Sequence, residues 1–228
     1  MLNIEQTNRN NIGIPKDQFL MGYREGDALY FDQKDPVHAM HESTAQIANS
    51  FANFNTVLDV GSGSGGLCYF LRKINPSVMT VTLDGNPKSA DSPFIIPEKH
   101  FVVRTDEEYK LVNEKNETVK FDLICSFEHF EHINPDTFEV FLNNIKQHSH
   151  ATTLIWVTAA AYKFEKEHEA HVHCNVKSYE EWVLFLKKCG FEILPASPLR
   201  QNMSSLHQDW LPPHGRLGCS HEFLLKIA

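Results

Sequence analysis

The stretch Val57-Leu-Asp-Val-Gly-Ser-Gly-Ser-Gly65 decides the fold of this chain. It starts as a short, β-branched apolar run, which is typical of a buried parallel strand, and it continues into glycines at alternate positions. Residues 65–74 then have the pattern of a helix that stops at Asn75-Pro76. Glycines between a strand and a helix allow a sharp turn with positive φ and a close approach of the backbone to a ligand. The stretch therefore predicts a ligand-binding loop.

Strands and helices are expected to alternate on both sides of this loop. The expected strands, besides the one at 56–60, are the apolar runs at 78–83, 100–103, 121–127, 153–158, 191–194 and 222–227. The expected helices, besides the one at 65–74, cover 36–54, a segment from Asn134-Pro135 as N-cap and N1 to about Gln147, and a segment from the Ser178 capping box to Gly190. This order predicts a mostly parallel sheet covered on both faces.

Composition and charge restrict the functional class. The 228 residues have a net charge of −8, which does not suit a general nucleic-acid binder. No apolar stretch reaches the roughly 18 residues of a membrane span, and residues 1–11 lack a signal-peptide core. The five cysteines are far apart and form no C-x-x-C pair, which indicates reduced thiols. We therefore expect a cytoplasmic protein without membrane partners.

A carboxylate after the second strand narrows the ligand. Asp84 stands where an acidic side chain accepts both hydroxyls of a ribose, in nicotinamide enzymes and in adenosyl-sulfonium enzymes alike. Gly61, Gly63 and Gly66 also satisfy the dinucleotide pattern G-x-G-x-x-G. Three features favour the sulfonium cofactor: Asp59 two positions before the first glycine, a block of about 55 residues before the first strand, and a final strand that suits antiparallel insertion as a seventh.

Together these motifs resemble those of class I S-adenosylmethionine-dependent methyltransferases. The matching segments are 57–65, Val81-Thr-Leu-Asp84, the fourth-strand motif at 121–133 and the late helix and strand at 178–191. The resemblance covers about residues 37–195 and the last strand. It implies a Rossmann-like, doubly wound sheet of seven strands with the last one antiparallel. Residues 1–36 are expected to form a separate helical lid or extension, and 37–228 the methyltransferase domain.

The resemblance also implies a cofactor site. Gly61 and Gly63 should pass under the methionine and ribose parts, Asp59 should lie near the methionine amine, and Asp84 should take the ribose hydroxyls. Asp106 is a candidate for the adenine amino group, and Ser126 or Phe127 should face the transferred methyl. The full set expected at the cofactor is Asp59, Gly61, Ser62, Gly63, Gly65, Asp84, Gly85, Asp106, Ser126 and Phe127.

The segment Glu128-His-Phe-Glu-His132 follows the fourth strand. If it turns helically, Glu128, Glu131 and His132 share one face and make a ligand set for Mg²⁺, Mn²⁺ or Zn²⁺, to which His171 or His173 could add a further ligand. The pattern E-x-x-E-H is similar to that of ubiquinone-pathway O-methyltransferases and of small-RNA terminal 2′-O-methyltransferases, where it is tied to a divalent metal. The alternative is that these residues only close the methionine pocket. A neutral imidazole of His129 or His132 is a candidate general base.

A second histidine group supplies another candidate base. His173 lies 17 residues before Gly190, a spacing that many relatives share for a histidine over the substrate pocket, and His171 is the rival. The expected function is methyl transfer from S-adenosylmethionine to an oxygen or nitrogen of a small molecule. The alternatives are a metal-dependent RNA 2′-O-methyltransferase, a nicotinamide-dependent dehydrogenase and a non-catalytic binder of the same fold.

Overall fold

The computed structural model describes residues 2–6, 36–160, 173–195 and 220–228. Within them, a seven-stranded sheet has the strand order β4-β3-β2-β6-β7-β9-β8. Its members along the chain are β2 (Thr56–Val60), β3 (Met79–Asp84), β4 (His100–Val102), β6 (Phe121–Ser126), β7 (Ser149–Ala160), β8 (Phe191–Ile193) and β9 (Ser220–Ile227). Neighbours from β4 to β7 are parallel, whereas β9 is antiparallel to β7 and to β8. The prediction of a seven-stranded sheet with an antiparallel last strand is confirmed.

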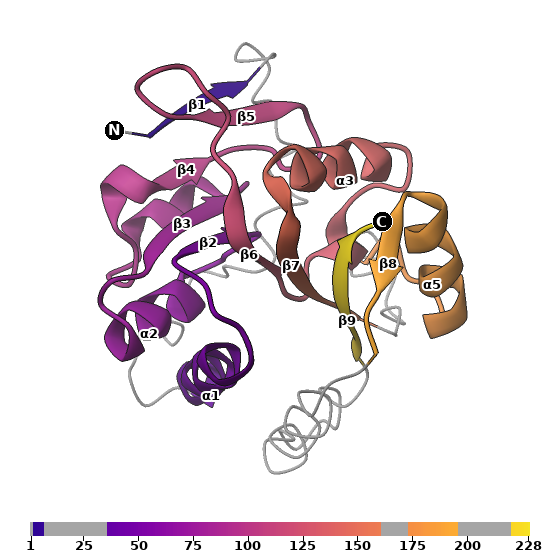
Figure 1. Ribbon diagram of the computed structural model, residues 1–228, viewed down its shortest axis with the longest axis horizontal. Coiled ribbons are helices and arrows are strands. Elements are labelled where there is room, and N and C mark those ends of the chain that lie inside the picture. The colour runs from indigo at the N-terminus through magenta and orange to yellow at the C-terminus, as the bar shows by residue number, and fades with distance from the viewer. Residues whose placement is uncertain (1, 7–35, 161–172, 196–219) are drawn as a thin grey trace.

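Helices cover both faces of the sheet (Figure 1). They are α1 (Pro36–Phe51) and α2 (Gly66–Ile74) on one face, and α3 (Phe138–Gln147) and α5 (Tyr179–Lys188) on the other. Successive residues of a strand point to opposite faces, so each strand contributes to two apolar layers. In β2, Val57 packs with the α1–α2 layer, and Leu58 packs with the α3–α5 layer. Such strands read as continuous apolar runs because both faces are buried.

Local signals explain where the helices begin and end. Helix α5 starts with a complete capping box, because Ser178 accepts from the N–H of Glu181 and the Glu181 carboxylate accepts from the N–H of Ser178. Gly190 follows this helix with φ of 80°. The predicted start of α3 is wrong: Asn134 accepts from the N–H of Asp136 and closes a turn, and the helix begins only at Phe138. An Asx turn and a helix N-cap use the same side-chain oxygen, and here the turn prevails.

A second, two-stranded sheet lies apart from the main one. It pairs β1 (Asn3–Gln6) with β5 (Tyr109–Val112) in antiparallel register. The expected lid at residues 1–36 lies mostly outside the described residues, and its described part is this strand. No described helix has the length and apolar character needed to cross a membrane.

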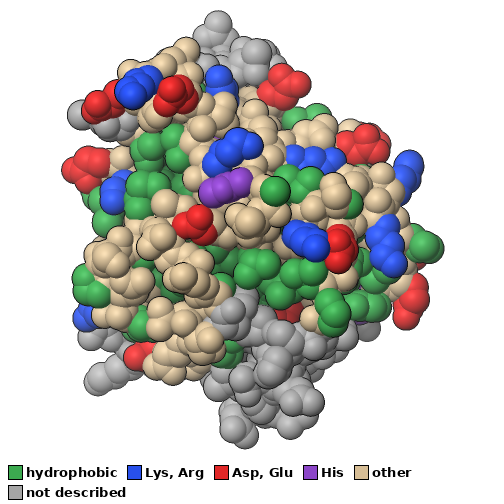
Figure 2. Space-filling model, viewed as in Figure 1, with side chains coloured by type: hydrophobic (Ala, Val, Ile, Leu, Met, Phe, Trp, Pro, Cys, Tyr) green, Lys and Arg blue, Asp and Glu red, His purple; other side chains and the backbone are tan. Residues whose placement is uncertain are grey.

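Charged side chains are dispersed over the visible surface. Figure 2 shows acidic and basic groups interspersed on one face of the molecule, with neither sign gathered into a stripe. A stripe of one sign is the usual footprint of a backbone-reading nucleic-acid site. This face therefore adds no support to a nucleic-acid partner.

Candidate active site

The glycine loop between β2 and α2 is held against the end of β3. The N–H groups of Gly61 and Ser62 both donate to the carbonyl of Leu83, at 2.8 and 2.9 Å. Gly61, Gly63 and Gly65 have φ of 75°, 53° and 75°. Only glycine adopts this left-handed region at little cost, so the alternate glycines are required by the turn itself. The hydroxyl of Ser62 is buried and has no hydrogen-bond partner among the described residues, which leaves it available to a polar ligand.

Asp84 ends β3 beside this loop. Its Oδ2 accepts from the N–H of Gly63 and its Oδ1 from the N–H of Asn86, both at 2.7 Å. Gly85, which lies between Asp84 and Asn86 in the sequence, is buried. Burial raises the pKa of Asp84 to about 6, although the hydrogen bonds from Asn86 and Gly63 oppose this shift. Each carboxylate oxygen has a second lone pair, so Asp84 can still accept two hydroxyl groups.

Asp59 is a second carboxylate under the loop. It is 4% exposed in β2, and the thiol of Cys68 is its neighbour at 4.0 Å. Burial, and then repulsion from Asp84, raises the pKa of Asp59 to about 7. A cationic ligand group beside it would stabilise the ionised form. The residue therefore fits the expected place near an amine.

Asp106 lies in the loop after β4. Its two oxygens accept from Nε and Nη2 of Arg104 at 3.1 and 2.8 Å, and Oδ2 also accepts from the hydroxyl of Thr137 at 3.3 Å. This ion pair holds the carboxylate in place and neutralises its charge. An amino group of a ligand would be a further donor to an already occupied acceptor.

The end of β6 carries the two residues expected to face the methyl group. The hydroxyl of Ser126 is buried and donates to the carbonyl of Val60 at 2.9 Å, so it joins β6 to β2. Phe127 is half-buried and meets Trp156 edge to face, with ring centroids 4.9 Å apart. The hydroxyl of Ser126 is thus used to join two strands of the sheet. Phe127 presents an aromatic surface at the carboxyl edge of the sheet.

His129 sits directly over the glycine loop. A Cβ on Gly61 would lie 2.4 Å from the Cγ of the His129 ring. The ring shares a hydrogen bond of 2.9 Å between its Nε2 and the hydroxyl of Thr105, and it meets Phe141 edge to face. Burial, and then repulsion from His132, lowers the pKa of His129 to about 3. Such an imidazole is a weak base. Its contacts connect the glycine loop to the loop that contains Thr105.

The expected helical turn over 128–132 is wrong. Glu128 has φ of 48°, and only the short η4 (Phe130–His132) follows it. The N–H of Glu128 donates instead to the hydroxyl of Thr158 in β7 at 2.9 Å. Glu128 is still near enough to Glu131 to raise the pKa of that carboxyl. The premise that Glu128, Glu131 and His132 share a helix face therefore fails.

The structure brings together a different trio. Glu131, His132 and His173 each offer a ligand atom, and these atoms lie within 4.8 Å of one another. Nε2 of His132 is 3.9 Å from Oε1 of Glu131, and the two imidazole rings are 4.9 Å apart. The Glu131 carboxylate is 1% exposed, and neither oxygen accepts a hydrogen bond of ordinary geometry from the described residues. Burial, and then Glu128, raises its pKa, and the nearby N–H groups of its own backbone and of Ala160 only partly compensate. A buried carboxylate of this kind needs a proton, a donor or a cation.

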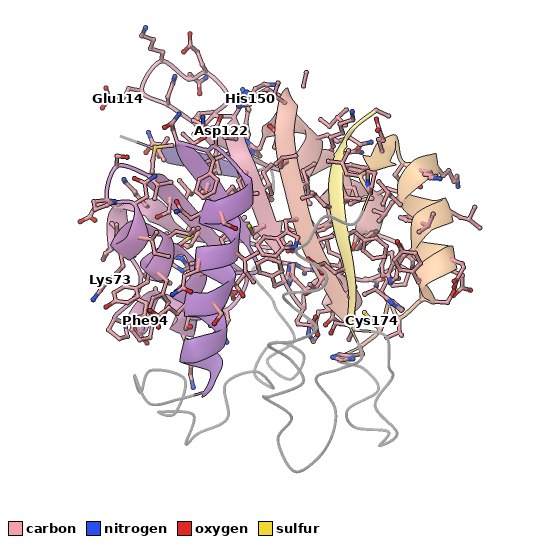
Figure 3. All side chains as sticks on the ribbon, turned by 60° about the horizontal axis from the view of Figure 1, so that its bottom comes forward. Lys73, Phe94, Glu114, Asp122, His150 and Cys174 are labelled. Carbon is pink, nitrogen blue, oxygen red and sulfur yellow. The ribbon has the colours of Figure 1, made fainter. Side chains whose placement is uncertain are left out.

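A segment before α5 positions His173 at this place. Asn175 donates its backbone N–H to the carbonyl of Glu131 at 3.0 Å and its side-chain amide to the carbonyl of Phe130 at 3.4 Å. The thiol of Cys174 donates to the carbonyl of His132 at 3.5 Å. Figure 3 shows Cys174 at the end of the sheet opposite Asp122 and His150. No sequence motif indicated Asn175, whereas the rival His171 lies outside the described residues.

Comparison with known proteins agrees with this architecture. The family model described as "Methyltransferase domain" matches residues 31–196. Among curated proteins, none matches the chain. Among solved structures, the 1,6-didemethyltoxoflavin N1-methyltransferase of Burkholderia thailandensis is similar with a TM-score of 0.64 and 13% identity, over 95% of this chain and 88% of that one.

Two further structures are similar. The TehB-like S-adenosylmethionine-dependent methyltransferase of Corynebacterium glutamicum has a TM-score of 0.56 and 18% identity, over 82% of this chain and 88% of that one. Mitomycin 7-O-methyltransferase has a TM-score of 0.56 and 13% identity over 83% of this chain, which spans only 54% of that enzyme. At such identities the structures establish the fold, and the family model, which covers most of the chain, establishes the family. The chain belongs to the methyltransferase-domain family.

Proposed function

We propose that this protein transfers a methyl group from S-adenosylmethionine to an oxygen or nitrogen of a small molecule. The observation that carries the proposal is the geometry of Asp84, whose two oxygens are aligned by the N–H groups of Gly63 and Asn86 at 2.7 Å. A ribose presents two adjacent hydroxyls, and an aligned carboxylate can accept both. The family assignment leaves no support for the dehydrogenase alternative.

The cofactor would supply an activated methyl group, so the protein has mainly to bind, orient and remove a proton. In this proposal Gly61, Gly63 and Gly65 give the cofactor close access to the backbone. Asp59 supports the methionine amine. The hydroxyl of Ser62, which has no partner among the described residues, offers the cofactor a hydrogen bond. The other cofactor contacts proposed are those of Gly85, Asp106, Ser126 and Phe127.

A small-molecule acceptor is supported by the kinds of similar structure. Two of the similar structures are enzymes named for methylation of 1,6-didemethyltoxoflavin at N1 and of mitomycin at 7-O. We assign the role of general base to His132 or His173 rather than to His129. His132 is 32% exposed beside the Glu131 carboxylate, whereas His129 is enclosed and has a pKa of about 3. The cytoplasmic location remains part of the proposal, and the free thiols of Cys68 and Cys125 suit it.

The trio Glu131, His132 and His173 also fits a divalent metal. One carboxylate and two imidazoles are ligands for such an ion. It would supply a cation to the oxygens of Glu131, which accept no hydrogen bond of ordinary geometry from the part of the chain that the structure describes. Because two of the three ligands are nitrogen, Mn²⁺ fits this set better than Mg²⁺. A bound ion would supply a Lewis acid for an acceptor oxygen. Relative to the sequence-based proposal, this set lacks Glu128 and contains His173, one of the two histidines expected as a further ligand.

Calorimetry with S-adenosylhomocysteine and with NADH tests the cofactor. We expect binding of the first, and a loss of about 2 kcal/mol or more of affinity in Asp84→Asn, because the ribose loses a charged acceptor. Asp91→Asn is the control, since Asp91 is an exposed carboxylate seven residues away in the same loop region. Tight NADH binding without homocysteine-analogue binding would end the proposal. A mass-spectrometric screen for methylated metabolites, with an RNA arm, would then identify the acceptor.

Mn²⁺ titration tests the metal. We expect binding to the wild type that Glu131→Gln and His173→Ala each abolish. His150→Ala is the matched control, because His150 lies 3.7 Å from Asp122 at the other end of the sheet and forms the same kind of pair. Should the wild type bind no Mn²⁺, and activity survive chelation, the trio acts through proton transfer alone.

A further inference from the structure

His100 is a buried imidazole whose two ring nitrogens are both engaged. It begins β4 opposite Thr82 of β3 and is 9% exposed. Its Nδ1 lies 2.9 Å from the hydroxyl of Thr82, and its Nε2 lies 2.8 Å from the hydroxyl of Ser89. Ser89 belongs to η2 (Pro87–Asp91), the turn that follows the end of β3. The ring thus joins the strand to the turn.

The donors of this cluster can be assigned by counting hydrogens. The hydroxyl of Ser89 donates to the carbonyl of Asn86 at 2.6 Å, so its single hydrogen is used. The Nε2 of His100 must then be the donor to Ser89. Burial lowers the pKa of His100 and so favours the neutral imidazole, whose Nδ1 accepts from Thr82. A hydrogen-bonded chain therefore runs from Thr82 through His100 and Ser89 to Asn86.

Asn86 connects this chain to the candidate ribose site. Its N–H donates to Oδ1 of Asp84 at 2.7 Å, while its carbonyl receives the hydroxyl of Ser89. The N–H and the carbonyl belong to the two peptide groups on either side of the Asn86 Cα, so both hydrogen bonds together fix the placement of this residue. A shift of Asn86 would remove a donor from Asp84. Desolvation then favours the protonated carboxyl, which is a poorer acceptor for hydroxyl groups. The placement of Asn86 thus affects the state of the carboxylate.

We propose that His100 is a positioning residue that, through Ser89, holds the Asn86 N–H on Asp84 and so prepares the carboxylate to bind the nucleoside. The two hydrogen bonds of His100 go to Thr82 and Ser89, neither of which belongs to the set expected at the cofactor. The inference rests on the proposed function for its ligand. The dependence of Asp84 on His100 does not rest on the proposed function and can be tested without the ligand.

Two conservative variants separate positioning from simple packing. The amide of His100→Asn reaches the place of Nδ1 and can keep the contact with Thr82. The longer amide of His100→Gln reaches the place of Nε2 and can keep the contact with Ser89. Each variant is neutral and loses one hydrogen bond, so we expect similar decreases in Tm. We expect His100→Asn to weaken S-adenosylhomocysteine binding about tenfold, and His100→Gln to stay within about twofold of the wild type.

The ionisation of Asp84, followed by carboxyl ¹³C NMR in the ligand-free protein, gives a second readout. We expect a higher pKa in His100→Asn and an unchanged one in His100→Gln. Equal effects of both variants on affinity and on this pKa, or no effect of either, would overturn the proposal. Asp84→Asn distinguishes the two levels: if it leaves affinity unchanged, the nucleoside assignment fails, while the NMR comparison still decides the role of His100.

Discussion

Replacing Gly61 by alanine should lower the free energy of unfolding, and the structure divides this loss into two contributions. The first part is backbone strain, because Gly61 has φ of 75°. A left-handed conformation costs an L-residue about 1–2 kcal/mol. The second part is a collision, since the new Cβ would lie 2.4 Å from Cγ and 2.5 Å from Nδ1 of His129. The ring cannot yield freely, because it is bonded to Thr105 and packed on Phe141.

The two parts add to a measurable magnitude. Displacing the ring sacrifices its hydrogen bond to Thr105, about 1 kcal/mol, and some of its packing. We therefore expect Gly61→Ala to lower the free energy of unfolding by about 2–4 kcal/mol. Gly190→Ala is the control for strain alone, because Gly190 has φ of 80° and the nearest described atom to its new Cβ would be Lys146 Nζ, at an ordinary contact distance of 3.8 Å. That variant should lose about 1–2 kcal/mol.

Urea unfolding of a double-mutant cycle isolates the collision. His129→Ala removes the ring that obstructs the new methyl group. Gly61→Ala should therefore be less destabilising in that background, with a coupling of about 1–2 kcal/mol in the direction of rescue. Additive effects of the two substitutions, or equal losses in Gly61→Ala and Gly190→Ala, would refute the idea that His129 lies on the loop.

Three further predictions concern buried polar groups. Since burial raises the pKa of Asp59 from 3.8 to about 7, its ionisation opposes folding increasingly as the pH rises between these values; Asp59→Asn should raise the free energy of unfolding at pH 8 by at most about 4 kcal/mol, and this gain should vanish near pH 4 in urea melts. Because the pKa of Asp84 is about 6, wild-type affinity for S-adenosylhomocysteine should fall as the pH drops through that value, and calorimetry should find a much flatter profile in Asp84→Asn. Asn175→Ala removes the side-chain donor to the carbonyl of Phe130 but keeps the backbone N–H that donates to Glu131, so it should cost about 1 kcal/mol of stability, whereas an unchanged Tm would show that water replaces the amide.

The main sheet and the glycine loop could be predicted because their signals are local. The run from Val57 to Gly65 contains the strand, the turn and the start of the helix within a few residues, and each step has its own residue types. The capping box at Ser178 is equally local. The pairing of Asn3–Gln6 with β5 was not predictable, because the two segments are about a hundred residues apart and neither has strong strand periodicity.

The group of Glu131, His132 and His173 shows more clearly what could not be predicted from the sequence. A helical spacing rule placed Glu128 with Glu131, but the left-handed conformation of Glu128 breaks that rule. His173 reaches His132 because Asn175 binds the backbone of η4 from 45 positions away. Tertiary hydrogen bonds of this range leave no periodic trace in a sequence. The sequence therefore indicated His171 or His173 as a partner of Glu131 and His132, but it neither decided between these two histidines nor excluded Glu128.

The position of β9 has a consequence for how the molecule is made. Strands β7 and β8 are joined only through β9, which comes after both in the chain. During synthesis, a ribosome will have released the whole glycine loop and β8 long before residues 220–227 emerge. Until β9 is made, the backbone groups on the edges of β7 and β8 that will face it are unpaired, and they can pair with strands of other chains.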